Sequence, residues 1–180
     1  MKGYLKTASI LAMICAVAAL ILSSLNSITA PVIADYEEQQ TINALNAVSH
    51  GYAMGEKEFV DSAITPYFIP LEEDGTLKGY IVELSGNGYG GLLKLVASFD
   101  TEGILLESKV VSNSETPGLG KKSENEGYMS KYIGKEKIPT SKNELSAEDS
   151  AAISGASITF GAIGKALLNG SSYIKTLEAK

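Results

Sequence analysis

A run of small residues near the C-terminus carries hydroxyl groups at the start of an expected helix. Ser154 to Ser157, Ser-Gly-Ala-Ser in sequence, precedes a stretch from Ile158 to Leu177 whose apolar residues recur at helical spacing. The first N–H groups of a helix have no intrahelical partner and lie at the positive end of its dipole, so they suit a phosphate carried on a nearby side-chain oxygen. Two interpretations stay open: an attachment site for a phosphate-bearing group, and a serine that only caps the helix.

A second motif, Glu115-Thr116-Pro117-Gly118-Leu119-Gly120, follows the last expected strand. Pro117 restricts one backbone dihedral, while Gly118 and Gly120 allow conformations that other residues avoid. We therefore expect a sharply bent, well-defined loop that presents backbone amides to a ligand. An ordinary Pro-Gly turn is the alternative, although the six residues together are far more specific than a bare Pro-Gly pair.

The remaining composition excludes several kinds of site. The chain has one cysteine, Cys15, and one histidine, His50, which rules out a disulfide framework and any cysteine or multi-histidine metal site. A net charge of -6 and the absence of arginine argue against a nucleic-acid partner. The glycine-rich segment Ser85–Gly91 is no dinucleotide fingerprint, because a strand is expected after it, but it permits close approach of a backbone or a ligand.

The N-terminal segment is long and apolar enough to span a bilayer, since no charged residue occurs from Thr7 to Ala30. We interpret residues 7–30 as a retained transmembrane anchor and residues 1–6 as a cytoplasmic tip. Lys2 and Lys6 precede the span, so the positive-inside rule leaves the rest of the chain outside the cytoplasm. A signal peptide cleaved after Ala30 is the alternative, and Pro31 argues against it because a proline hinders cleavage.

The rest of the chain predicts an α+β fold. Residues 31–50 are expected to form a stalk helix, and two sets of turn residues, 73–75 and 100–103, predict hairpins. A short helix is expected from Glu126 to Ile133, before the final helix. The fold class is a single N-terminal transmembrane helix followed by an extracytoplasmic domain, residues 51–180, with flanking helices and a mainly antiparallel sheet whose strands are Tyr67–Pro70, Leu77–Leu84, Leu92–Phe99 and Ile104–Val111.

The order of these features resembles the FMN-binding G subunit of the Rnf ferredoxin:NAD oxidoreductase complex, which is related to the C subunit of Na⁺-translocating NADH:quinone reductase. The resemblance covers nearly the whole chain. Its landmarks are the single span, Asn26–Pro31 at the outer end of that span, the Gly88–Gly91 turn, the Glu115–Gly120 loop, and Ser154–Ser157 before a C-terminal helix. It implies that residues 51–180 are an FMN-binding domain and that the chain is a single-pass protein of a prokaryotic plasma membrane.

The resemblance also implies which residues hold the flavin. The family motif is Asp-x-x-Ser/Thr-Gly-Ala-Thr, with FMN joined by a phosphoester to the last residue, here Ser157; Ala151 stands at the Asp position, which a flavin transferase would read. Thr159 is an alternative acceptor. No catalytic or metal-binding residue is expected, and the cofactor-binding set is Ser157, Ser154, Gly155, Ala156, Thr159, Glu115, Thr116, Pro117, Gly118, Leu119 and Gly120.

The function implied is that of an electron-transfer subunit of a multi-subunit ion-translocating oxidoreductase, a translocase, which is not catalytic alone. Pyridine-nucleotide motifs and cluster-binding cysteines are absent from the sequence, so partners must supply both. The expected partners are polytopic flavin or quinone-reductase-like subunits, iron-sulfur subunits and a flavin transferase. Two alternatives stay open: a free-standing membrane-anchored flavoprotein that shuttles electrons, and a non-redox tethered binding or scaffold domain.

Overall fold

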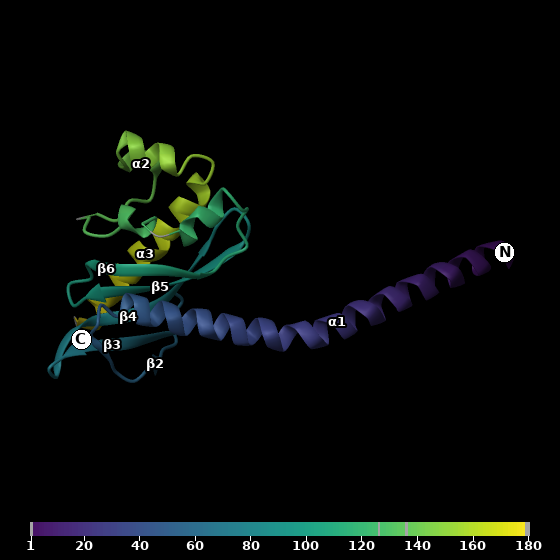
Figure 1. The fold of residues 1–180 in the computed structure, drawn as a ribbon, viewed down its shortest axis with the longest axis horizontal. Helices are drawn as coiled ribbons and strands as arrows, with labels where there is room; N and C mark the ends of the chain where they lie inside the picture. The colour runs from purple at the N-terminus through teal and green to yellow at the C-terminus, as the bar shows by residue number, and fades with distance from the viewer. Residues whose placement is uncertain (1, 126, 136, 179–180) are drawn as a thin grey trace. The chain divides into compact units, whose positions relative to one another are not determined.

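In the computed structural model, the described residues are 2–125, 127–135 and 137–178 of the 180. The chain divides into two compact units, Met1–Gln39 and Gln40–Lys180. Figure 1 shows the first unit as part of helix α1 (Lys2–Val48) and the second as a sheet with its surrounding helices.

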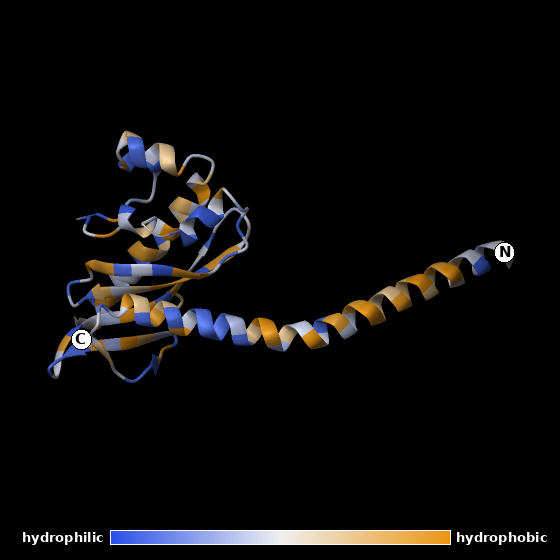
Figure 2. Cartoon of the chain, in the orientation of Figure 1, coloured by the Kyte–Doolittle hydropathy of each residue, from blue (hydrophilic) through white to orange (hydrophobic). Residues whose placement is uncertain are grey.

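The first unit is helical and apolar. Among the described residues, α1 is the one helix long and apolar enough to cross a membrane, with a mean hydropathy of 2.4 over its most apolar window. Figure 2 shows this long hydrophobic stretch towards the N-terminus. The hydroxyls of Ser24, Ser27 and Thr29 each donate to a carbonyl four residues earlier, at 2.8, 2.9 and 3.0 Å. These polar side chains are therefore satisfied within the helix, as an apolar environment requires.

The second unit contains the antiparallel meander that the turn residues predict; three of its four main strands are longer than expected, and the fourth has the expected length but begins one residue later. The strand order is β1-β3-β4-β5-β6, with β2 also paired to β3. The turn after β3 has positive φ at Asp74 and Gly75 (51° and 72°), the conformation of a tight hairpin. The strands are β1 (Ala53–Met54), β2 (Glu58–Phe59), β3 (Tyr67–Glu73), β4 (Thr76–Asn87), β5 (Leu92–Asp100) and β6 (Leu105–Ser112).

One face of the sheet packs on the last turns of α1, which belong to the second unit. Ala44 and Val48 are fully buried there, against Leu71, Ile81 and Val96. The stalk helix expected over residues 31–50 corresponds to the end of α1, which stops at Val48. Its last turns contribute to a hydrophobic core, a role that the polar composition of residues 35–43 does not indicate.

Helix α3 (Ser157–Glu178) covers the opposite face of the sheet. Phe160, Ile163 and Leu167 recur at helical spacing and are buried in the larger hydrophobic cluster, which includes Leu84 and Leu95 of the sheet. The remaining helices are short: η1 (Gly120–Glu124), η2 (Met129–Lys131), η3 (Lys142–Glu144) and α2 (Ala147–Ala152).

The short helix expected from Glu126 to Ile133 is reduced to η2, a single 3-10 turn. Gly127 and Gly134 adopt φ of 78° and 65°, so left-handed residues flank it on both sides; Glu126 itself lies outside the described residues. Tyr132 follows η2, is completely buried, and donates its hydroxyl to the Phe160 carbonyl at 2.9 Å. The Tyr132 and Phe160 rings stack with centroids 4.7 Å apart, which braces the first turn of α3.

Candidate cofactor site

Helix α3 begins without a side-chain cap. The Ala156 carbonyl accepts from the Phe160 N–H at 2.9 Å, so Ala156 occupies the N-cap position and offers no side-chain oxygen. Ser154 and Ser157 are exposed, and neither hydroxyl has a hydrogen-bond partner within the described part of the chain. The first amides of α3 are thus available to an anion, and the interpretation of either serine as a helix cap does not fit this geometry.

The loop 115–120 is sharply bent, as expected. The N–H groups of Leu119 and Lys121 both donate to the Thr116 carbonyl, at 3.1 and 3.3 Å, and Gly118 has φ of 77°. The Glu115 N–H donates to Asn113 Oδ1 at 2.9 Å, which fixes the entry to the loop. Local hydrogen bonds therefore hold this segment in one shape.

A hollow of 430 Å³ joins the two motifs. Most of the predicted cofactor residues line it, from Glu115 and Thr116 on one wall to Gly155–Thr159 on the other, but Ser154, Pro117 and Gly118 do not. Three further hollows measure 510, 520 and 460 Å³, and none of these three contains both motifs. Since the two motifs are far apart in sequence, their shared hollow is the main evidence that they form one site.

Sequence reasoning did not include two lining residues, Tyr89 and Ile158. Their side chains are 75% and 58% exposed, and Leu119 beside them is 43% exposed. Large apolar side chains gathered at the rim of a hollow are typical of ligand sites. Tyr89 could have been identified as a lining residue from its place within the Gly88–Gly91 turn. Ile158 lies between two hydroxyl residues, and nothing in the sequence distinguishes it from the other apolar residues of the helix.

The two hydroxyl residues at the start of α3 differ sharply in exposure and in hydrogen bonding. Ser157 is exposed, whereas Thr159 is only 1% exposed and donates its hydroxyl to Glu115 Oε2 at 2.8 Å. Close to Glu115, burial raises the pKa of Tyr128 to about 12, and the charge of Glu115 adds to the effect. Of the two hydroxyl residues at the start of α3, Ser157 therefore carries the accessible oxygen, whereas the Thr159 hydroxyl is buried against Glu115.

The residues of the hollow fit FMN, which combines a flat ring system, a polyol chain and a phosphate. The exposed Tyr89, Leu119 and Ile158 offer apolar surface for a ring, the amides at the start of α3 suit the phosphate, and the volume lies within the range of about 300–1,000 Å³ usual for small-molecule sites. The chain thus has complementary groups for the ring and for the phosphate of this cofactor.

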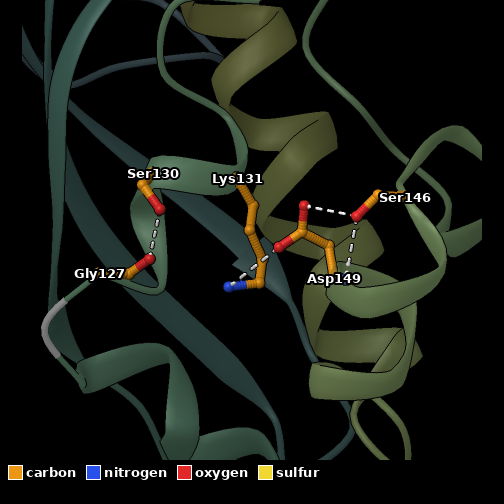
Figure 3. Close-up of polar contacts among 5 residues, drawn as sticks. All are labelled: Gly127, Ser130, Lys131, Ser146 and Asp149. Atoms are coloured by element: carbon orange, nitrogen blue, oxygen red, sulfur yellow. Dashed lines mark hydrogen bonds and ion pairs between the residues drawn. The ribbon is translucent and has the colours of Figure 1, made fainter.

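Asp149, two residues before the acidic position of the family motif, is engaged in other contacts. Ala151 is exposed near the end of α2. Asp149 donates its N–H to Ser146 Oγ at 3.1 Å, accepts from the same hydroxyl at 3.1 Å, and pairs with Lys131 at 3.8 Å (Figure 3). Asp149 is therefore occupied in capping α2 and linking it to η2.

Comparison with known proteins agrees with this geometry. A family model described as an FMN-binding domain matches residues 88–171, and one described as the RnfG N-terminal region matches residues 2–48. The first match contains both motifs of the hollow, and the second coincides with α1. Fold and site therefore define an FMN-binding domain preceded by a long apolar helix.

Relatives of known name indicate which kind of FMN-binding protein the chain resembles. The chain is 25% identical to the G subunit of the proton-translocating ferredoxin:NAD(+) oxidoreductase complex of Clostridium ljungdahlii, over 84% of this chain and 80% of that protein. It is 26% identical to the G subunit of the ion-translocating oxidoreductase complex of Vibrio parahaemolyticus, over 77% of this chain and 74% of that protein. The chain is thus a relative of these G subunits, with an RnfG N-terminal region followed by an FMN-binding domain.

Among solved structures, the crystal structure of Shewanella oneidensis NqrC matches with a TM-score of 0.47 and 16% sequence identity. That match covers 67% of this chain and 69% of the NqrC chain.

Proposed function

We propose that this chain is an electron-transfer subunit of a membrane ion-translocating ferredoxin:NAD⁺ oxidoreductase of the Rnf type, and that it carries FMN through a phosphoester on Ser157. The observation that carries the proposal is the hollow shared by the Ser154–Ser157 motif and the Glu115–Gly120 loop. The family match supports the cofactor, and the names of the relatives support the complex.

In this proposal each part of the hollow has its own task. Ser157 Oγ is the point of attachment, and the uncapped amides of α3 bind the phosphate. Tyr89, Leu119 and Ile158 shield the ring from water, and the loop amides near Thr116 orient it. When bound, FMN supplies reversible electron transfer, while the protein determines its position and surroundings.

We place the domain on the outer side of the membrane. Lys2 and Lys6 precede the apolar part of α1, and the positive-inside rule assigns such lysines to the cytoplasm. A covalent link is useful on the outer side because it keeps the cofactor at high local concentration where free FMN would be scarce. Other subunits supply the iron-sulfur and pyridine-nucleotide sites, and a flavin transferase forms the phosphoester.

The experiment that tests the function is the intact mass of the denatured chain purified from its native membrane, with peptide mapping of residues 151–165. An FMN-sized increment on Ser157, together with co-purification of polytopic partner subunits, is the expected result. An increment without partners would indicate a free-standing electron shuttle. An unmodified chain beside flavinylated partner subunits would refute the covalent site and indicate either non-covalent binding of FMN or a structural role.

Restoring the missing acid is expected to raise the extent of flavinylation. Ala151→Asp recreates the family motif at an exposed position, so a transferase that reads the acid would gain a contact at little cost in stability. We expect the flavinylated fraction, measured by intact mass after a short co-expression with the transferase, to rise several-fold. Ala152→Asp is the matched control, because it adds the same charge to the neighbouring exposed residue in the wrong register. An equal gain in both variants would contradict this expectation.

A further inference from the structure

Glu115 lines the hollow, but its side chain is almost completely buried. The residue is 4% exposed. Its Oε1 accepts from the Gly90 N–H at 3.1 Å, and its Oε2 accepts from the Thr159 hydroxyl at 2.8 Å. The donors lie 25 residues before and 44 residues after Glu115 in the sequence. One carboxylate therefore joins the turn 88–91, the loop 115–120 and the first turn of α3.

Two glycines provide the space for this carboxylate. A Cβ at Gly88 would collide with Glu115 Oε1, and a Cβ at Gly120 would collide with Oε2 and would lie 2.7 Å from the Glu115 Cβ. Both glycines belong to the motifs that form the hollow. The absence of a side chain at these two glycines leaves room for the buried Glu115 carboxylate. At Gly120 it also allows the bend of the loop.

The carboxylate depends on few partners. Within the described part of the chain, no ion pair includes Glu115. Its support is the pair of hydrogen bonds and the positive end of α3, where Thr159 is the third helical residue. A buried carboxylate that loses a hydrogen-bond donor pays a large cost in free energy. Loss of either donor should therefore loosen the segments that Glu115 joins.

We propose that Glu115 is the positioning residue of the cofactor hollow: its carboxylate clasps the 88–91 turn to the first turn of α3, and by engaging Thr159 it leaves Ser157 as the hydroxyl at the start of α3 that is open to modification. The second part rests on the proposed function. Thr159 and Ser157 lie two residues apart, and both line the hollow. The difference between them is that the Thr159 hydroxyl is buried and bonded to Glu115, whereas the Ser157 hydroxyl is exposed.

The test compares Thr159→Val with Thr159→Ser in the full-length chain in detergent. Valine keeps the shape of threonine but removes the donor, and serine keeps the donor. In chain produced without flavin transferase, we expect amide hydrogen exchange at residues 88–91 and 157–160 to become about tenfold faster in Thr159→Val. Exchange in Thr159→Ser, and exchange of the β4 and β5 core amides in both variants, should match the wild type.

A second variant removes both hydrogen bonds together. Glu115→Met has a similar length but no oxygen acceptor, so it can form neither bond. We expect faster exchange in both segments, 88–91 and 157–160, and wild-type exchange of the β4 and β5 core amides. Wild-type exchange of both segments in Thr159→Val, or failure of Thr159→Ser to restore protection, would overturn the clasp.

Flavinylation provides an independent measurement. With transferase present, we expect modification of Ser157 to fall about tenfold in Thr159→Val, in proportion to the loss of local order, and to remain in Thr159→Ser. Modification of Thr159 in the wild-type chain would overturn the assignment of the free hydroxyl. A wild-type chain that takes no flavin would refute the proposed function, while the exchange comparison in flavin-free chain would still decide on the clasp.

Discussion

Replacing Ser157 by alanine is expected to remove the FMN-sized mass increment completely. The side chain is exposed and forms no hydrogen bond within the described residues, so the fold loses almost nothing when the hydroxyl is removed. The second residue of the hollow with an acceptor oxygen at the start of α3, Thr159, is engaged with Glu115. The mass increment is measured on the intact, denatured variant after co-expression with the transferase. The free energy of unfolding, measured by thermal denaturation, should differ from that of the wild type by less than about 0.5 kcal/mol.

The matched substitution is Ser157→Thr, which keeps the nucleophilic oxygen and adds the methyl group found at this position in the family motif. We expect the increment to remain, because threonine offers an equivalent oxygen with a more restricted rotamer. Full modification of Ser157→Ala would show that the acceptor lies elsewhere. Mapping that increment to Thr159 would mean that its hydrogen bond to Glu115 opens readily, which would contradict the clasp as well.

Much of the sheet could be predicted from local patterns. The Asp74-Gly75 pair favours a tight hairpin, and both residues adopt the positive φ that such a turn needs. Apolar runs such as Leu92–Phe99 are long enough to identify central strands. The two-residue strands β1 and β2 were missed because such short segments carry no periodicity of their own.

The end of α1 shows a different limit of prediction from local sequence patterns. The sequence from Asp35 onwards is polar and indicates an exposed stalk, yet Ala44 and Val48 are completely buried against the sheet. Two small apolar residues four positions apart form a narrow stripe that is weak evidence on its own. Their burial depends on a sheet face formed by residues much later in the chain, which a local pattern cannot reveal.

The candidate site was predictable as two motifs, but their relation was not. Composition and turn chemistry predict that loop 115–120 is bent and that Ser157 lies at a helix start, and both features are observed. The burial of Glu115 and its bond to Thr159 depend on contacts between segments far apart in the sequence. A motif glutamate beside a ligand loop favours a direct cofactor contact, whereas the observed hydrogen bonds connect the walls of the site.

Placing a methyl group at Gly120 is expected to be the most damaging small substitution in the hollow. Gly120 is buried, and the added Cβ of Gly120→Ala would meet the Glu115 carboxylate and lie 2.8 Å from its Cδ. Overpacking costs about 1–3 kcal/mol, and a displaced carboxylate that leaves its donors unpaired costs a similar amount. We therefore expect the free energy of unfolding to fall by about 2–5 kcal/mol, measured by urea denaturation of the full-length chain in detergent with tyrosine fluorescence.

Gly118→Asn is the control in the same loop. Gly118 has φ of 77° and open space around its Cα, so a Cβ there meets no atom within 4 Å. Asparagine tolerates this left-handed conformation better than other residues with a Cβ, and we expect a loss of less than about 1 kcal/mol. Gly120→Ala tests the packing around Glu115, whereas Gly118→Asn tests the backbone conformation that the bend requires. Equal losses in the two variants would mean that the loop depends on its glycines for backbone freedom alone, and that Glu115 can leave its buried position without consequence.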